Sequence, residues 1–228
     1  MSKNRTFIHI GCHKAGSTFV QEELLQKLKN IKPITFFNKN EYLEKEFLYI
    51  SQCADIYYEN NVEQVISKYY QKFEDIFISA EGLSGNGYNV FTGGFLIESI
   101  AKRLHNIFPD GKILIIIRNQ KDAIESYFKD DVKYGYLGDF QSWFNWRLNT
   151  CQLNYFKYFQ LIKTYQNIFG KDKVNIRRKF GRNAFAANAA PEQRLAAFKE
   201  YVVDTLNSFA NLFSKLVAKE LKTKYSPK

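Results

Sequence analysis

The feature that constrains the fold most is an apolar run at residues 112–117, Lys-Ile-Leu-Ile-Ile-Ile, which follows a Pro-Asp-Gly turn sequence. An uninterrupted apolar run of this length is typical of a central strand whose two faces are both covered. Shorter apolar segments at residues 7–10 and 76–79 predict two more buried strands. Longer stretches of helical pattern separate these segments, and such alternation predicts an α/β domain with a mostly parallel sheet.

The remaining elements follow from the same kinds of pattern. Asn119 is expected to cap the helix after the central strand, with Asp122 in its first turn. Further strands are expected at residues 34–37 and 174–176, a Gly- and Asn-rich loop at 81–94, and helices at 17–29, 95–108 and 191–222. Helical pattern also dominates residues 41–73 and 140–169. With 45% hydrophobic and 25% charged residues the composition is globular, so 228 residues predict a single domain over residues 1–228.

A glycine-containing loop joins the first expected strand to the first expected helix. Residues 11–18 read Gly-Cys-His-Lys-Ala-Gly-Ser-Thr. A helix that begins directly after such a loop presents unpaired backbone N–H groups and the positive end of its dipole, and both bind phosphate. Gly11 and Gly16 let the backbone approach an anion because they carry no Cβ. The spacing resembles the P-loop pattern G-x-x-x-x-G-K-[ST]. We therefore predict a P-loop-like, three-layer α/β fold with a central, mostly parallel sheet flanked by helices.

The loop departs from the ATP-binding pattern where that pattern is most specific. Ser17 follows the second glycine, where the P-loop has its lysine, and the only lysine of the loop is Lys14. ATP-hydrolysing enzymes of that class also use an acidic residue at a strand end to hold Mg²⁺, whereas the clearest strand here ends at Arg118. The loop is expected to bind phosphate without a magnesium–ATP complex, and no metal is expected to be required.

A second pair of candidate anion ligands follows the central strand. Arg118 comes directly after the apolar run, and Ser126 lies just over two helical turns further on. Ligands of open parallel sheets bind beyond the carboxyl ends of the strands, so Arg118 is expected at the same edge as Lys14. A guanidinium and a hydroxyl suit a second phosphate. The alternative is an arginine paired with Asp122 or Glu125 and a solvated serine.

These segments together resemble the motifs of the sulfotransferase family that uses 3′-phosphoadenosine 5′-phosphosulfate (PAPS), in its bacterial and carbohydrate-type members. Residues 9–18 resemble the family's 5′-phosphosulfate loop, H-I-G-x-x-K-x-G-[ST]-T. Residues 117–127 are similar to its 3′-phosphate motif, R-[ND]-P-x-x-R-x-x-S, and residues 79–83, Ser-Ala-Glu-Gly-Leu, resemble its S-x-E segment. The order of the motifs matches over residues 7–134, somewhat more than half of the chain.

The sequence departs from the family pattern at three places. Gln120 stands where proline is usual, and Ala123 stands where a second arginine often occurs. The usual Y-E-x-L stretch after residue 176 is missing, and residues 177–182, Arg-Arg-Lys-Phe-Gly-Arg, stand in its region. This basic stretch resembles the loop that closes over the 3′-phosphate in some members.

The resemblance implies transfer of a sulfuryl group from PAPS to an acceptor hydroxyl, with a carbohydrate or glycan as the expected acceptor and adenosine 3′,5′-bisphosphate (PAP) as the product. Lys14 would neutralise charge on the leaving 5′-phosphate. The residues implied to bind the nucleotide are Lys14, Ala15, Gly16, Ser17, Thr18, Arg118 and Ser126. The acceptor hydroxyl also needs a base. Glu81 is the first candidate, because it follows the third strand and should face the same cleft, and His13 is the second.

Two other classes of function remain open. A P-loop kinase acting on a small molecule would consume ATP with magnesium. The net charge of +10 also fits a basic nucleic-acid-binding protein, but Lys and Arg are scattered without a basic stripe or a stacking motif, so no nucleic-acid partner is expected.

Other residues carry weaker expectations. Cys12, Cys53 and Cys151 are odd in number and widely spaced, which predicts neither a disulfide framework nor a zinc site. No signal peptide or membrane span is expected, and together with the cysteines this indicates a cytoplasmic setting. His105 is expected to be structural. Four aromatic residues fit core packing better than a sugar-stacking surface: Trp143, Phe144, Trp146 and Tyr155.

Overall fold

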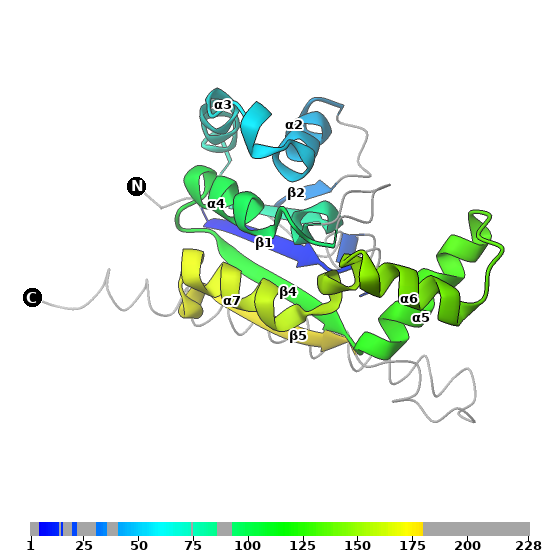
Figure 1. Ribbon diagram of the computed structural model, residues 1–228. Helices are drawn as coiled ribbons and strands as arrows, with labels where there is room; N and C mark the ends of the chain where they lie inside the picture. The colour runs from blue at the N-terminus through cyan, green and yellow to red at the C-terminus, as the bar shows by residue number, and fades with distance from the viewer. Residues whose placement is uncertain are drawn as a thin grey trace, which may run out of the picture. The chain divides into compact units, whose positions relative to one another are not determined.

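The structure is a computed structural model, and it describes residues 5–13, 15, 20–21, 31–35, 41–73, 75–85 and 93–179 (Figure 1). The chain divides into two compact units, Met1–Lys179 and Phe180–Lys228, and all of the described residues belong to the first. The helix expected at residues 191–222 lies outside the described residues. So does the helix expected at 17–29, apart from Val20 and Gln21.

A five-stranded sheet forms the centre of the first unit (Figure 1). The strands lie in the order β2-β3-β1-β4-β5, and every pairing is parallel. The strands are β1 (Arg5–Gly11), β2 (Lys32–Thr35), β3 (Asp75–Ala80), β4 (Lys112–Arg118) and β5 (Val174–Lys179). The predicted α/β fold with a parallel sheet is confirmed. The strand expected at residues 34–37 begins two residues earlier, and the one expected at 174–176 continues to Lys179.

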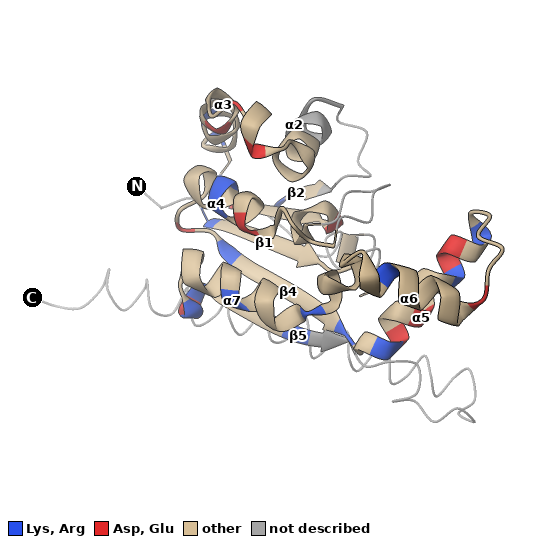
Figure 2. Cartoon of the chain, in the orientation of Figure 1, with Lys and Arg blue, Asp and Glu red and all other residues tan. Residues whose placement is uncertain are grey.

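The middle of the sheet is apolar on both faces, as the run in β4 predicts. Ile8 and Ile10 of β1 and Ile113 and Ile115 of β4 are all buried. Figure 2 shows the charged residues of these strands near their ends, with the middle uncharged. Burial of this kind stabilises the fold in proportion to the apolar area removed from water.

Two helices, α4 (Ile97–Ile107) and α7 (Tyr158–Phe169), pack side by side on one face of the sheet (Figure 1). The rings of His105 in α4 and Phe169 in α7 meet edge to face, with their centroids 5.1 Å apart. This contact between the two helices agrees with the structural role expected of His105. None of the helices in the described part of the chain is both long enough and apolar enough to cross a bilayer.

The two long segments with helical pattern at residues 41–73 and 140–169 are helical, but each is interrupted by a 3-10 turn. Residues 41–73 form α2 (Glu41–Gln52), a 3-10 turn η3 (Asp55–Tyr57) and α3 (Asn61–Tyr70). Residues 140–169 form α6 (Phe140–Asn149), a 3-10 turn η5 (Gln152–Phe156) and α7. Cys151 has a left-handed backbone with φ of 60°, which no α-helix accommodates. The apolar pattern continues through this break because η5 also buries its side chains, so periodicity alone reads the segment as one helix.

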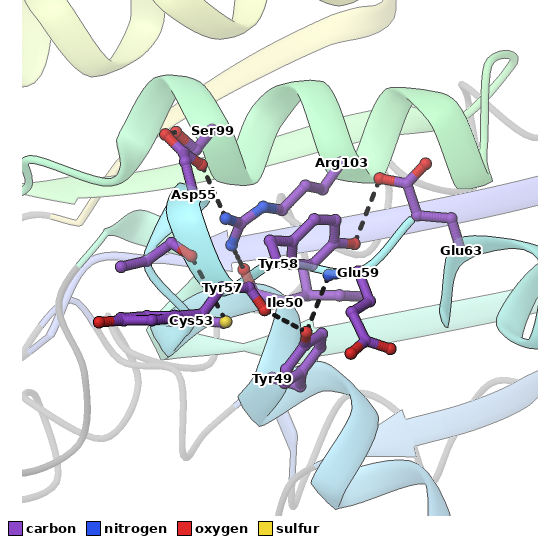
Figure 3. Close-up of polar contacts among 11 residues, drawn as sticks. Tyr49, Ile50, Cys53, Asp55, Tyr57, Tyr58, Glu59, Glu63, Ser99 and Arg103 are labelled. Atoms are coloured by element: carbon purple, nitrogen blue, oxygen red, sulfur yellow. Dashed lines mark hydrogen bonds and ion pairs between the residues drawn. The ribbon is translucent and has the colours of Figure 1, made fainter. Parts of the chain in front are cut away.

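A buried arginine holds the first of these breaks in place (Figure 3). Arg103 of α4 is only 4% exposed, and its guanidinium donates to the Ile50 carbonyl and to Asp55 Oδ1, both at 2.7 Å. The same guanidinium lies 3.7 Å from the centroid of the Tyr58 ring, and Ser99 Oγ donates to Asp55 Oδ2 at 2.7 Å. A buried charge is tolerated only when it is paired. The network therefore fixes the end of α2 and η3 against α4.

The segment after β4 forms the capped helix that its sequence predicts. Helix α5 (Gln120–Lys133) begins at the N-cap Asn119, whose side chain accepts from the Asp122 N–H at 3.4 Å, as predicted. Part of the loop expected at residues 81–94 is instead a 3-10 turn, η4 (Glu81–Ser84), and residues 86–92 lie outside the described part of the chain. Gly85 ends this turn with φ of 91°, and a Cβ there would lie 2.5 Å from Ile97 Cγ1, so only glycine fits.

Candidate active site

Three candidate segments meet at one edge of the sheet. β1 lies between β3 and β4, with Ile10 paired to Ala80 and Gly11 paired to Ile116. His13 comes two residues after β1, Glu81 directly follows β3, and Arg118 ends β4. The carboxyl ends of neighbouring parallel strands share an edge, which is where open α/β sheets bind ligands. The strand register therefore puts Arg118 at the same edge as the glycine loop.

Part of the glycine loop can be described. Lys14, Gly16, Ser17 and Thr18 lie outside the described residues. The N–H of Ala15 donates to the Cys12 carbonyl at 2.9 Å, so the backbone turns sharply as soon as β1 ends. Both residues are buried. Burial raises the pKa of the Cys12 thiol to about 12, so Cys12 stays protonated and packs as a small apolar side chain.

The two residues expected as alternative bases contact each other. His13 Nδ1 lies 2.9 Å from Glu81 Oε2, and both side chains are largely buried. The rings of Tyr127 and Tyr155 each lie 6.1 Å from the His13 ring, measured between centroids. A carboxylate on Nδ1 favours the tautomer with the proton on that nitrogen, which makes Nε2 the basic nitrogen of a neutral imidazole.

The turn that carries Glu81 is held by two buried tyrosines. The Tyr155 hydroxyl lies 2.7 Å from Ser84 Oγ, and it also accepts from the His13 N–H at 2.9 Å. The Tyr165 hydroxyl donates to the Leu83 carbonyl at 2.7 Å. Burial raises the pKa of Tyr155 well above its ordinary value, so its hydroxyl keeps its proton. The sequence carries no motif for these contacts, because the tyrosines come from η5 and α7, more than 70 residues away.

The aromatic residues considered for sugar stacking separate into two groups. Trp143 and Tyr155 are buried, which agrees with the preference for core packing. Trp146 is 51% exposed, and the guanidinium of Arg147 lies 4.7 Å from its ring centroid. Phe144 is half-buried.

Arg118 ends β4 and Ser126 lies in the middle of α5, and both are half-buried. Burial raises the pKa of Tyr158 above its ordinary value, and the Arg118 charge partly offsets that rise, so the two residues are neighbours. Of the two acids considered as ion-pair partners of Arg118, Glu125 lies 4.0 Å from Lys121 Nζ.

The last strand, β5, adds basic residues to this edge, because it pairs Lys179 with Arg118 and Arg177 with Ile116. Figure 2 shows Lys and Arg where β4 leads into α5.

Gln120, at the start of α5, makes a contact that proline could not make. Its Nε2 donates to the Phe156 carbonyl at 2.7 Å and ties the first turn of α5 to η5. Proline has no side-chain donor and could not make this bond.

A second histidine, His9 of β1, is completely buried. His9 Nδ1 is 2.8 Å from Ser79 Oγ, and Gln21 Nε2 donates to the same hydroxyl and to the Ser79 carbonyl. Among the described residues, His9 Nε2 has no hydrogen-bond partner. Burial lowers the pKa of His9 to about 4, although the Glu81 charge partly offsets this effect.

The buried His9 predicts a loss of stability in acid. Above pH 6.5 His9 is neutral in both states, but between pH 6.5 and about 4 the unfolded chain binds a proton that the folded chain does not. The free energy of unfolding should therefore fall with pH across this window, by on the order of 3 kcal/mol from this residue. Urea unfolding of His9→Asn should show a shallower fall than the wild type. His105→Asn is the control and should keep the steep fall, and equal slopes for wild type and His9→Asn would contradict the prediction.

Among the described side chains, no group of three or more His, Cys, Asp or Glu residues is arranged to hold a metal ion.

One comparison with a solved structure supports the fold. A sulfotransferase from Alicyclobacillus acidocaldarius has a similar structure, with a TM-score of 0.52 and 17% sequence identity over 81% of this chain and 76% of that one. A thymidylate kinase from Candida albicans aligns with a TM-score of 0.40 and 14% identity over 90% of this chain and 93% of that one. No protein-family model and no curated protein matches the sequence. The first likeness, together with the sheet order, confirms the P-loop-like α/β fold.

Proposed function

We propose that the protein is a sulfotransferase that moves a sulfuryl group from PAPS to an acceptor hydroxyl, with a carbohydrate as the expected class of acceptor. The observation that supports this most is the strand register, which brings two segments expected to bind anions to one sheet edge. Neighbouring strands lie roughly 5 Å apart and each strand residue adds roughly 3.3 Å, so Gly11 and Arg118 are separated by about 8 Å. One nucleotide phosphorylated at both its 3′ and 5′ positions can span two such segments.

The nucleotide would be gripped at two places. The Lys14 ammonium and the backbone N–H groups of residues 16–18 hold the 5′-phosphate, whereas the Ala15 N–H, expected to join them, is donated to the Cys12 carbonyl. Arg118 and Ser126 hold the 3′-phosphate, and the basic end of β5 adds positive charge there.

In this reaction the protein would position the two substrates and stabilise the charge that develops during transfer. The acceptor oxygen forms a bond to sulfur while the bond from sulfur to the 5′-phosphate oxygen breaks, and the leaving phosphate keeps the electron pair. Lys14 stabilises the charge that develops on this phosphate, as preorganised cations do in phosphoryl transfer.

The proton of the acceptor hydroxyl passes to the pair formed by His13 and Glu81. The carboxylate on Nδ1 orients the imidazole, so Nε2 accepts the proton and Glu81 stabilises the imidazolium that forms. This assignment replaces Glu81, the first candidate on sequence grounds, with its contact partner His13. The reason is that a Glu81 oxygen is already engaged at 2.9 Å by His13.

A small-molecule kinase is the second candidate, and one observation favours it. Glu81 follows β3, which is the direct neighbour of β1, and a carboxylate beside a phosphate loop can hold Mg²⁺. β4, on one side of β1, ends in Arg118, but β3, on the other side, is followed directly by the acid Glu81. Nucleotide preference separates the two candidates.

Titration calorimetry with PAP, AMP, ADP and magnesium–ATP tests the proposal. PAP should bind about 10- to 100-fold more tightly than AMP, because a charge-assisted hydrogen bond contributes roughly 1.5–3 kcal/mol. Arg118→Ala should lower the affinity for PAP toward that for AMP and leave AMP binding unchanged. Lys121→Ala, in the helix that follows Arg118, is the control, since the Lys121 side chain is 84% exposed. Tightest binding of magnesium–ATP, abolished by EDTA, would favour the kinase instead.

A further inference from the structure

The backbones of the His13 and Glu81 segments are connected by a chain of hydrogen bonds through two buried hydroxyls. The His13 N–H lies 2.9 Å from the Tyr155 hydroxyl, which lies 2.7 Å from Ser84 Oγ, and Ser84 Oγ lies 2.6 Å from the Glu81 carbonyl. Tyr155 and Ser84 are both buried. This chain of hydrogen bonds joins the loop after β1 to the turn after β3.

The direction of every bond in this chain is determined by its ends. A backbone N–H can only donate and a backbone carbonyl can only accept. The Tyr155 hydroxyl therefore accepts from His13 and gives its own proton to Ser84 Oγ, whose proton goes to the Glu81 carbonyl. All three bonds point the same way, an arrangement in which neighbouring bonds strengthen one another.

The turn that supplies Tyr155 also contacts the third candidate segment. Gln120 Nε2, in the first turn of α5, donates to the carbonyl of Phe156, the residue after Tyr155. The Tyr127 ring of α5 packs at 5.3 Å from the Phe156 ring, centroid to centroid. The turn η5 thus touches the loop after β1, the turn after β3 and the helix after β4.

We propose that Tyr155 is a positioning residue, whose hydroxyl sets the geometry between His13 and Glu81 by bonding the backbone segments that carry them. This inference rests on the proposed function where it concerns turnover. Strand pairing fixes β1 beside β3 only as far as Ile10 and Ala80, so His13 and Glu81 lie just beyond the paired strands, where their side chains meet at 2.9 Å. With the Tyr155 and Ser84 hydroxyls in place, the imidazole meets the carboxylate in one arrangement, and preorganisation of this kind is what rapid proton transfer requires.

Tyr155→Phe removes the hydroxyl and keeps the ring, so it tests the chain directly. We expect kcat to fall about 10-fold or more, while KM for the acceptor and the affinity for PAP change by less than about 3-fold, because misplaced catalytic groups act on the reacting step. Ser84→Ala should have a similar effect. The double variant should be little worse than either single variant, since both changes break the same chain.

Tyr165→Phe is the matched control. It removes a buried tyrosine hydroxyl that donates to Leu83 in the same turn, η4. It breaks no bond to His13. It should lower Tm by an amount similar to Tyr155→Phe and lower kcat much less, because its bond holds only the η4 side of the pair. If Tyr155→Phe and Tyr165→Phe lower Tm equally and neither changes kcat, Tyr155 is only structural and the inference fails.

A readout without turnover separates this inference from the proposed function. The chain has three histidines, so the imidazole NMR signals of His13 can be assigned with a His13→Gln variant. Tyr155→Phe should shift the His13 signals and leave those of His105 in place. Shifted His13 signals in a protein that neither binds PAP nor transfers sulfate would retain the positioning role and reject the function. Unshifted signals in an active sulfotransferase would reject the positioning role alone.

Discussion

Lys14→Ala is expected to slow sulfuryl transfer from PAPS by about 10²- to 10³-fold, the range measured when one preorganised electrostatic donor is removed from an active site. The proposed mechanism explains the size of the effect. Charge develops on the 5′-phosphate as its bond to sulfur breaks, and Lys14 is the only lysine in the loop that would contact that phosphate. Initial rates at saturating PAPS measure the loss in kcat.

Two controls make this result specific. Lys14→Arg keeps the charge but changes its geometry, so it should recover part of the rate. Lys121→Ala removes an exposed lysine from α5, near the same sheet edge, and should leave the rate unchanged. Far-ultraviolet circular dichroism of Lys14→Ala should match that of the wild type. Transfer by folded Lys14→Ala at a rate close to wild type would show that Lys14 has no part in the reaction.

The fold was predictable because the strands are encoded locally. The apolar run of β4 and the shorter runs of β1 and β3 predict buried parallel strands, and burial of these residues follows. The Asn119 cap also depends only on residues within four positions of each other. Helix interruptions were not predictable in this way. The residues of η5 keep an apolar pattern through the break, and the left-handed backbone of Cys151 has no glycine to announce it.

The candidate site was only partly predictable for a related reason. Strand ends indicate which residues reach the ligand edge, so His13, Glu81 and Arg118 could each be selected from the sequence. Whether His13 and Glu81 act separately or as a pair depends on the pairing of β1 with β3. Tyr155 could not be selected at all, because its hydroxyl contacts segments 71 and 142 residues away in the chain.

His13→Ala is expected to lower kcat by about 10²- to 10⁴-fold, the usual contribution of general acid–base catalysis. The effect should be largest with acceptors whose hydroxyl is least acidic, because these depend most on the base. PAP affinity should be unchanged, since the role proposed for His13 is on the acceptor. Added imidazole should restore part of the rate by entering the space left by the side chain, whereas added formate should not.

The same measurements on Glu81→Ala decide which member of the pair takes the proton. If Glu81 orients His13, Glu81→Ala should be the less damaging variant, and the double variant should equal His13→Ala within about 3-fold, because residues that act as a unit are not additive. Gln in place of Glu81 is a weaker test, since its amide can still bond Nδ1 in either tautomer. The opposite pattern would reverse the roles: a larger loss in Glu81→Ala, rescue by formate, and near wild-type turnover in His13→Ala would make Glu81 the base. His13 would then only hold the carboxylate in place across the 2.9 Å contact between Nδ1 and Oε2.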